Sequence, residues 1–149
     1  MSINSRVENI VERFNQYDDW EDRYRELIKI GKALPAMEES YQVDKYKIKG
    51  CQSQVWLKPG FSDGIVTFYA DSDAVLVKGI IGILVDVYSG SSPKEIIATT
   101  PDFLKKIGIT DHLSMNRTNG LASMVKQIQM YALVFDSLVS KGVMSADNL

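Results

Sequence analysis

The residue best suited to covalent chemistry is the single cysteine, Cys51, which lies in the segment Gly-Cys-Gln-Ser-Gln-Val at residues 50–55. A thiolate is the reactive form, but an ordinary thiol has a pKa of about 8.5 and needs a nearby cation, helix N-terminus or base to ionise at neutral pH. Lys47 and Lys49 precede the thiol and are candidates for that help. Gly50 supplies backbone freedom for a tight turn. The pattern predicts a thiol presented on a loop.

Two other roles for Cys51 compete with this one. A lone cysteine is commonly a small core residue, but the polar flanks of Cys51 favour a loop. One cysteine cannot form an internal disulfide. One cysteine and one histidine also fall short of the four ligands that a structural zinc site or an iron–sulfur cluster usually takes. We therefore expect no metal site within a single chain.

The only histidine, His112, is a candidate general base for Cys51, which would make the chain a thiol hydrolase or redox sensor. A structural histidine before the last helix is the interpretation we favour. Lys78, on an apolar helix, and Arg117, in the first turn of a helix, are locally unfavourable choices. Either is explained by a partner, although Lys78 can also extend to solvent.

Two amphipathic helices are predicted before the thiol. The first starts at a capping box at Ser5–Glu8, and its apolar positions recur with helical spacing through Phe14. Asp18 or Asp19 caps the second helix, which Gly31 and Pro35 end. Residues 36–46 are predicted to form a connection.

The middle of the chain changes to a strand pattern. Residues 55–57 and 65–69 are rich in strand formers and are separated by Pro59-Gly60 and Asp63-Gly64, which predicts a hairpin. Ile48 is assigned to a third short strand. The cluster Asp71-Ser72-Asp73 is expected to cap a buried helix at residues 74–88. Gly79 and Gly82 in that helix are expected to permit close packing.

The C-terminal third is predicted to be helical. Ser92-Pro93 and Thr100-Pro101-Asp102 each start a short helix, and a long helix runs from near Asn116 to before Gly142. The sum is an α+β fold, with a small antiparallel sheet of about three strands packed against several helices. We expect a single domain over residues 1–149.

Composition excludes several classes of function. The chain has 17 lysines and arginines and 19 acidic residues, which gives a net charge of −2, and the charged residues are dispersed along the sequence. A nucleic-acid-binding face, which needs clustered cations, is therefore not expected. The apolar run at residues 74–87 is too short for a membrane span of about 20 residues. The N-terminal sequence lacks a secretory signal, and one cysteine suits a reducing compartment. We expect a cytoplasmic protein.

The motifs together resemble the SufE family of sulfur acceptors over residues 7–135. The resemblance rests on the segments Gly50–Trp56, Asp71–Ala74, Val77–Gly79, His112–Ser114 and Asn119–Leu121, together with Arg117. The cysteine motif is its most specific part. Met115 stands where family members often have proline, and Thr118 replaces a position that is commonly basic or polar.

The resemblance implies a function in iron–sulfur cluster assembly and a fold similar to SufE and IscU-type proteins. The chain would take sulfur from a SufS-type cysteine desulfurase, stimulate that enzyme, hold the sulfur as a persulfide on Cys51 and pass it to a SufB-type scaffold. Pyridoxal phosphate would belong to the desulfurase, and this chain would carry no cofactor and have no independent turnover. Family members are often homodimers. The alternative is a non-catalytic activator of the desulfurase.

The resemblance also implies which residues meet the partner. They are Gln52, Asp71, Ser72, Asp73, Lys78, His112 and Arg117. Cys51 would be the persulfide nucleophile, and we expect its apolar neighbours Val55 and Trp56 to shelter the carried sulfur.

Overall fold

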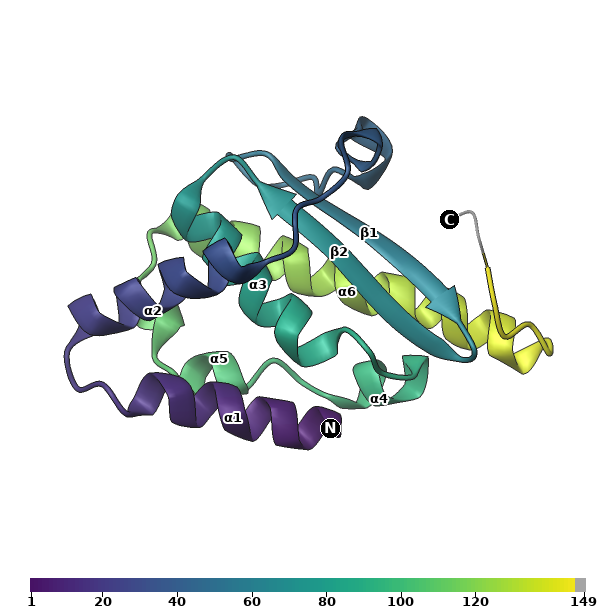
Figure 1. The fold of residues 1–149 in the computed structure, drawn as a ribbon, viewed down its shortest axis with the longest axis horizontal. Coiled ribbons are helices and arrows are strands. Elements are labelled where there is room, and N and C mark those ends of the chain that lie inside the picture. Colours follow the sequence, from purple (N-terminus) through teal and green to yellow (C-terminus); the bar gives the residue numbers. More distant parts are fainter. Residues whose placement is uncertain (147–149) are drawn as a thin grey trace.

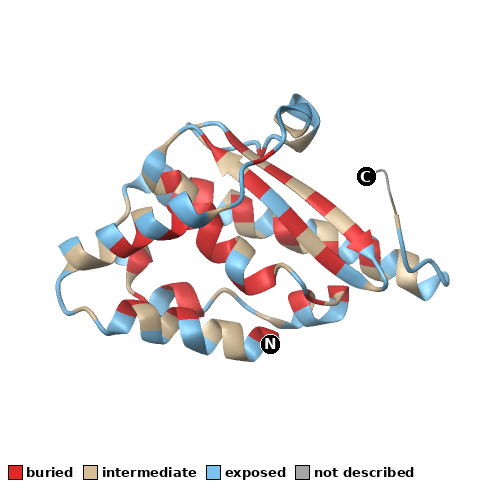
Figure 2. Cartoon of the chain, viewed as in Figure 1, coloured by how far each residue is buried: buried red, intermediate tan, exposed pale blue. Residues whose placement is uncertain are grey.

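Helix α3 (Val75–Tyr88) is the central element of the computed structural model, which describes residues 1–146. It contacts helices α1 (Ile3–Asn15), α2 (Trp20–Ala33) and α6 (Met115–Ser140) and strand β2 (Ile65–Ser72) (Figure 1). The helix is buried along most of its length (Figure 2). An apolar helix of this kind must be covered on all sides, and the other elements provide that cover.

The N-terminal helices begin at polar caps. Ser2 caps α1 by accepting a hydrogen bond from the backbone N–H of Ser5 at 3.1 Å. The capping box predicted to start at Ser5 is therefore wrong, because Ser5 lies inside the helix. Asp19 caps α2 and accepts from the N–H of Glu21 at 2.9 Å. Of the two aspartates considered for this position, Asp19 is the cap.

Helix α2 passes through Gly31 and ends at Ala33, so glycine does not stop it as predicted. Gly31 instead faces α3: a Cβ atom built on it would lie 2.9 Å from the backbone N of Gly79. A Cβ on Gly79 would lie 2.4 Å from the carbonyl oxygen of Leu27. The glycines therefore allow α2 and α3 to approach backbone to backbone, which confirms the expected close packing at Gly79.

The hairpin consists of β1 (Val55–Ser62) and β2, paired antiparallel. Asp63 and Gly64 connect them with φ values of 55° and 78°, as in the type I′ turns that suit the twist of a hairpin. Pro59 lies within β1, although it was predicted to interrupt the strand. It pairs with Phe68, whose N–H donates to Ser89 Oγ instead of across the sheet, so the missing N–H of proline leaves no gap in the ladder.

The sheet has two strands among the described residues, not three. Near Ile48 the predicted third strand is only a bridge between Lys47 and Trp56, with the N–H of Ile48 donating to the carbonyl of Val55 at 2.8 Å. The connection before it contains two 3₁₀ turns, Glu39–Tyr41 and Asp44–Tyr46. These turns lie against the outer face of the hairpin, where Lys58 approaches the rings of three tyrosines, namely Tyr41, Tyr46 and Tyr69.

The start of α3 differs from the prediction. Ala74 occupies its N-cap and no side chain caps the helix, because Asp71 and Ser72 still belong to β2. Ser72 Oγ does accept from the N–H of Ala74 at 3.2 Å. The polar cluster therefore serves the end of the hairpin, as described below, more than the helix.

The C-terminal elements follow the predicted order. Ser92 and Glu95 form a capping box at α4 (Pro93–Ala98). Asp102 precedes α5 (Phe103–Lys106) without a side-chain cap, and a 3₁₀ turn (Ile109–His112) leads to α6. The apolar stripe of α6 is buried at its main positions, including Leu121, Met124, Ile128, Ala132 and Phe135.

The α+β class is confirmed, with helices around a small antiparallel hairpin. Within residues 1–146, no helix combines the length and apolar character that crossing a membrane requires.

Candidate functional site

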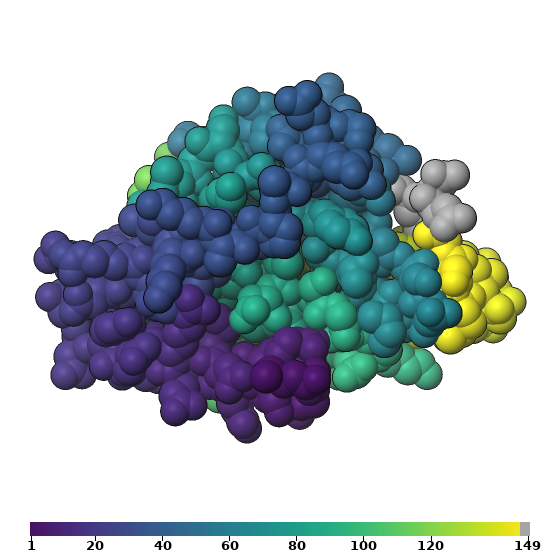
Figure 3. Space-filling view, in the orientation of Figure 1, coloured from purple at the N-terminus to yellow at the C-terminus, as the bar shows by residue number. Residues whose placement is uncertain are grey.

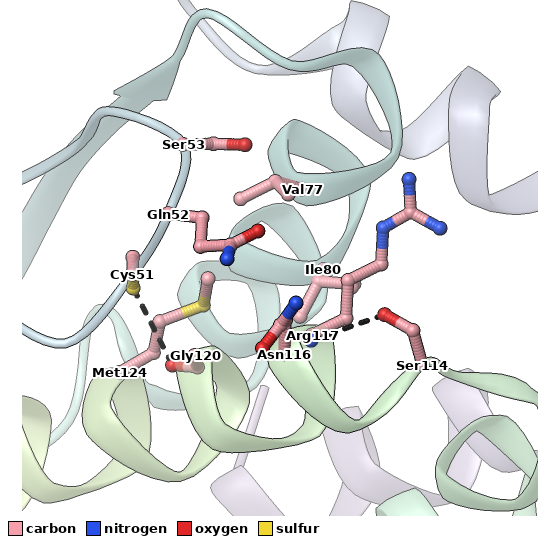
Figure 4. A pocket seen from close by; sticks show the side chains of 10 residues that line it. All are labelled: Cys51, Gln52, Ser53, Val77, Ile80, Ser114, Asn116, Arg117, Gly120 and Met124. Atoms are coloured by element: carbon pink, nitrogen blue, oxygen red, sulfur yellow. Dashed lines mark hydrogen bonds between the residues drawn. The ribbon is translucent and has the colours of Figure 1, made fainter.

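Cys51 lies on the loop that enters β1, half-buried and packed against the core. Its Sγ atom points toward the first turns of α6 and donates to the carbonyl oxygen of Gly120 at 3.6 Å (Figure 4). Cys51 was expected to be either a thiol presented on a loop or a small core residue. It is partly both, because the loop presents the thiol while the core covers one side of it.

A pocket of about 230 Å³ opens beside the thiol. The thiol loop, the first turns of α3 and the start of α6 form its walls (Figure 4). Its lining consists of Cys51, Gln52, Ser53, Val77, Ile80, Ser114, Asn116, Arg117, Gly120 and Met124. Three elements far apart in the sequence therefore meet at one sulfur atom.

The apolar shelter of the pocket comes from α3 and α6. Val55 is fully buried in the core and Trp56 lies on the outward-facing side of β1, and neither lines the pocket. The expectation that they shelter the sulfur is wrong. Val77, Ile80 and Met124 line it instead.

The spacing of the missed residues carried a usable signal. Val77 and Ile80 are three positions apart, and Asn116, Gly120 and Met124 repeat every four, so each set shares one helix face. That pattern could have indicated a common wall, but not which wall faces the thiol.

Two glycines make room for the thiol loop. Gly50 has φ of 90°, and a Cβ on it would lie 2.6 Å from Ser123 Oγ on α6. Glycine is thus required here both for conformation and for space, as predicted. A Cβ on Gly120 would lie 3.4 Å from Sγ of Cys51, an ordinary contact distance, so α6 passes close to the sulfur at this position.

The loop is braced at Gln54 by the end of β2. Ser72 Oγ donates to the carbonyl of Gln54 at 2.7 Å, and the N–H of Asp73 reaches the same oxygen at 3.3 Å. The carboxylate of Asp73 accepts from the backbone N–H of Gln54 at 3.0 Å and from its side-chain amide at 3.3 Å. Four hydrogen bonds therefore fix the chain three residues after the thiol.

Asp71 and Lys78 pair with each other at 3.3 Å. Asp71 also accepts from the side-chain amide of Gln42 at 3.3 Å. This contact accounts structurally for a cation on an apolar helix, since Lys78 crosses from α3 to the hairpin. Neither residue lines the pocket.

His112 does not line the pocket either. Its ring stacks on Trp20 with centroids 3.9 Å apart, and its carbonyl accepts from the hydroxyl of Tyr24 at 3.0 Å. These contacts join the connection before α6 to α2, which is the structural role favoured from the sequence. The geometry supplies no base at the thiol from this residue.

Gln52 and Arg117 are the two residues of the expected partner surface that the structure places at the thiol pocket. The backbone N–H of Arg117 donates to Ser114 Oγ at 3.3 Å and so belongs to the cap of α6. Its guanidinium extends away from Cys51 along the opposite side of the pocket (Figure 4). Arg117 is exposed, so its charge faces whatever enters.

Burial raises the pKa of the Cys51 thiol above its ordinary value. The cause is desolvation, which penalises the thiolate. The prediction that Lys47 and Lys49 activate the sulfur is therefore wrong for the free protein.

We expect alkylation of Cys51 by iodoacetamide to show a higher pH midpoint in the folded protein than in urea. The folded thiol ionises at higher pH, so at neutral pH the native protein should also react more slowly than the unfolded chain. Rates measured by intact mass between pH 7 and about 10.5 test this. An equal or lower midpoint in the native state would contradict the effect of burial.

Comparison with known proteins identifies the family. Residues 8–132 match the SufE model, described as an Fe-S metabolism associated domain. The chain belongs to the SufE family. An uncharacterised SufE-like protein of Rhizobium etli is 43% identical over 133 residues, which cover 86% of this chain and 90% of the relative. This assignment places the chain in iron–sulfur metabolism.

A more distant SufE-like relative and a solved structure agree with this family assignment and with the fold. The SufE-like protein 1 of Arabidopsis thaliana, described as chloroplastic/mitochondrial, is 36% identical over 129 residues, covering 86% of this chain and 35% of that longer protein. A hypothetical protein from Thermus thermophilus has a solution structure with a TM-score of 0.75. Its sequence is 19% identical, and the match covers 89% of this chain and 96% of that one. That structure supports the SufE-like fold.

Proposed function

We propose that this SufE-family protein accepts sulfur from a cysteine desulfurase and carries it as a persulfide on Cys51. The observation that carries the proposal is the half-buried Sγ of Cys51 at the wall of a small pocket lined by α3 and α6. Such a pocket has room for one further sulfur atom and limits the access of bulk thiols. The chain has no second cysteine to attack the carried sulfur and release it.

The transfer is a thiol–disulfide type of exchange. The Cys51 thiolate attacks the outer sulfur of the donor's cysteine persulfide, a new S–S bond forms, and the donor's S–S bond breaks. The donor cysteine leaves as a thiolate and takes up a proton, so no external oxidant or reductant is consumed. Because burial raises the Cys51 pKa, the attack requires that docking shift the thiol from the Gly120 carbonyl or that a partner base take its proton.

The proposal assigns the chemistry of sulfur release to the partner. A SufS-type desulfurase would hold pyridoxal phosphate and generate the persulfide, and this chain would contribute only the acceptor thiol and stimulate the enzyme by removing its product. A SufB-type scaffold would receive the sulfur. A reducing compartment, which we take to be the cytoplasm, would keep Cys51 reduced between cycles.

Partner contacts are assigned to exposed side chains. Gln52 and Arg117 border the pocket, and Asp73 and His112 are also exposed. Ser72 is buried and hydrogen-bonded to Gln54. We therefore give Ser72 the task of holding the thiol loop in place for docking, and the paired Asp71 and Lys78 that of joining α3 to the hairpin.

Intact mass spectrometry tests the proposal directly. The protein is incubated with its desulfurase, pyridoxal phosphate and cysteine, and it should gain at least one sulfur atom at Cys51 that a reductant removes. In the same assay Arg117→Ala should slow the gain without changing the alkylation rate of Cys51.

The competing functions give other results. Stimulation of the desulfurase with no mass gain would make the chain an activator. Turnover of a thioester or amide without any desulfurase would make it a hydrolase. Either result would overturn the carrier proposal.

A further inference from the structure

A second cavity lies beside the chain segment that leads into the thiol loop. It occupies about 610 Å³ between residues 44–49 and the middle of α6. Four lysines line it, Lys45, Lys47, Lys49 and Lys126, and Asp44 is the only acidic residue among its lining. We call this cavity the lysine groove. A chain of net charge −2 thus concentrates positive charge beside its reactive sulfur.

The charges of the groove are not neutralised within the described part of the chain. The ion pairs of residues 1–146 involve other side chains, and all four groove lysines are exposed. Lys58 provides a contrast, since its ammonium lies 4.6 Å from the ring centroid of Tyr41 and is thereby held on the sheet. The ammonium of Lys45 also lies over a ring, 5.4 Å from the centroid of Tyr46. Among residues 1–146, Lys47, Lys49 and Lys126 have neither an ion pair nor a ring contact and are free to meet an external anion.

The arrangement of the lysines favours a polypeptide over a small anion. Lys47 and Lys49 flank the buried Ile48, and both line the same wall segment of the groove. Lys126 stands on the opposite wall, one helical turn from the exposed, apolar Met130. A small anion needs donors that converge on one point, whereas cations spread along an open groove with an apolar residue suit successive carboxylates of a peptide.

The groove is continuous with the site. The segment that carries Lys45, Lys47 and Lys49 runs directly into Gly50 and Cys51. The blue residues that lead into this segment project at the top of the molecule (Figure 3). Helix α6 lines both cavities, with Gly120 and Met124 facing the pocket and Lys126 facing the groove. An occupant of the groove would therefore lie within a few residues of the thiol.

We propose that the lysine groove docks an acidic segment of the desulfurase that delivers sulfur to Cys51. This inference rests on the proposed function. Complementary charge at the edge of an interface raises the association rate and fixes orientation more than it adds affinity. The groove would thus align the incoming persulfide with the pocket, while Cys51 performs the exchange.

Charge reversal away from the thiol tests the proposal. Lys45→Glu combined with Lys126→Glu should raise the concentration of this protein that half-saturates sulfur transfer by about tenfold at low ionic strength. The difference should vanish near 1 M salt, where the screening length is about 3 Å. Alkylation of Cys51 by iodoacetamide should be unchanged, which shows that the site is intact.

The matched control is Lys29→Glu combined with Lys94→Glu, which changes the net charge equally at exposed positions outside the groove. Equal effects of the two double variants would overturn the inference. A second result would also overturn it. In that result a single-stranded oligonucleotide binds the unaltered protein but not the groove variant, while the two proteins take up sulfur equally well. If the unaltered protein takes up no sulfur at all, the proposed function itself fails, and the groove inference with it.

Discussion

Replacing Cys51 with serine is expected to abolish sulfur acceptance while the fold and the binding of the desulfurase are retained. Serine lacks the sulfur that forms the persulfide bond, so the mass gain should disappear completely. The substitution is structurally mild, because Cys51 is only half-buried and its Sγ contact with the Gly120 carbonyl is a hydrogen bond that a hydroxyl can also make. Intact mass after incubation with the desulfurase, thermal unfolding and a binding titration measure the three quantities.

A relocated thiol provides the control. Ser62 is exposed at the far end of β1, so Ser62→Cys in the Cys51→Ser background restores one thiol far from the pocket. It should acquire little sulfur from the desulfurase. If the relocated thiol is charged as fast as Cys51, then the pocket contributes nothing. Loss of desulfurase binding by Cys51→Ser would instead show that the thiol supplies docking energy.

Features encoded by neighbouring residues could be predicted from the sequence. The Ser92 capping box and the Asp63-Gly64 turn depend on side chains within a few residues of one another and are confirmed. For the second helix the sequence narrowed the cap to Asp18 or Asp19, and the structure has Asp19. The capping box at Ser5 failed for a local reason: Ser2 starts the helix first and uses the N–H of Ser5. Two adjacent cap signals cannot be ranked without the packing of Ile3, which is buried.

Features that depend on tertiary contact were not predicted. The third strand fails because Ile48 forms a single bridge to β1 and has no second strand to extend it. Asp71 faces Lys78, and Asp73 faces Gln54, only because the hairpin ends where α3 begins. Each aspartate has a plausible local use as a helix cap, and the stronger distant partner is invisible in the sequence.

The candidate site also combines features that neighbouring residues encode with features that depend on tertiary contacts. Cys51 and its loop follow from the polar residues around it, and the family resemblance added Gln52 and Arg117, which do lie at the pocket. The walls at Ile80 and Asn116 require knowing that α3 and α6 cross beside the loop. The pKa of the thiol is the clearest case, since Lys47 and Lys49 suggested a lowered value while burial by the assembled helices raises it.

Gly79→Ala is expected to be the most damaging mild substitution for stability. Its Cβ would lie 2.4 Å from the carbonyl oxygen of Leu27, a backbone atom, so α2 and α3 must move apart. Overpacking of this kind outweighs the gain of about 1 kcal/mol in helix propensity, and we expect a net loss of about 2 kcal/mol in unfolding free energy.

The expected fall in melting temperature for Gly79→Ala is about 4–8 °C, measurable by circular dichroism. Gly82→Ala is the matched control on the same helix. The atom closest to its Cβ would be a side-chain methyl of Ile30 at 3.0 Å, which can shift, and the backbone oxygen of Ile30 would lie at 3.5 Å, an ordinary contact. It should change stability by less than about 1 kcal/mol. Equal losses for the two variants would mean that the α2–α3 contact is not set by the glycine. Moving α2 and α3 apart would also loosen the pocket wall at Ile80, one residue from Gly79. Gly79→Ala should therefore speed alkylation of Cys51 even well below the melting temperature of the variant.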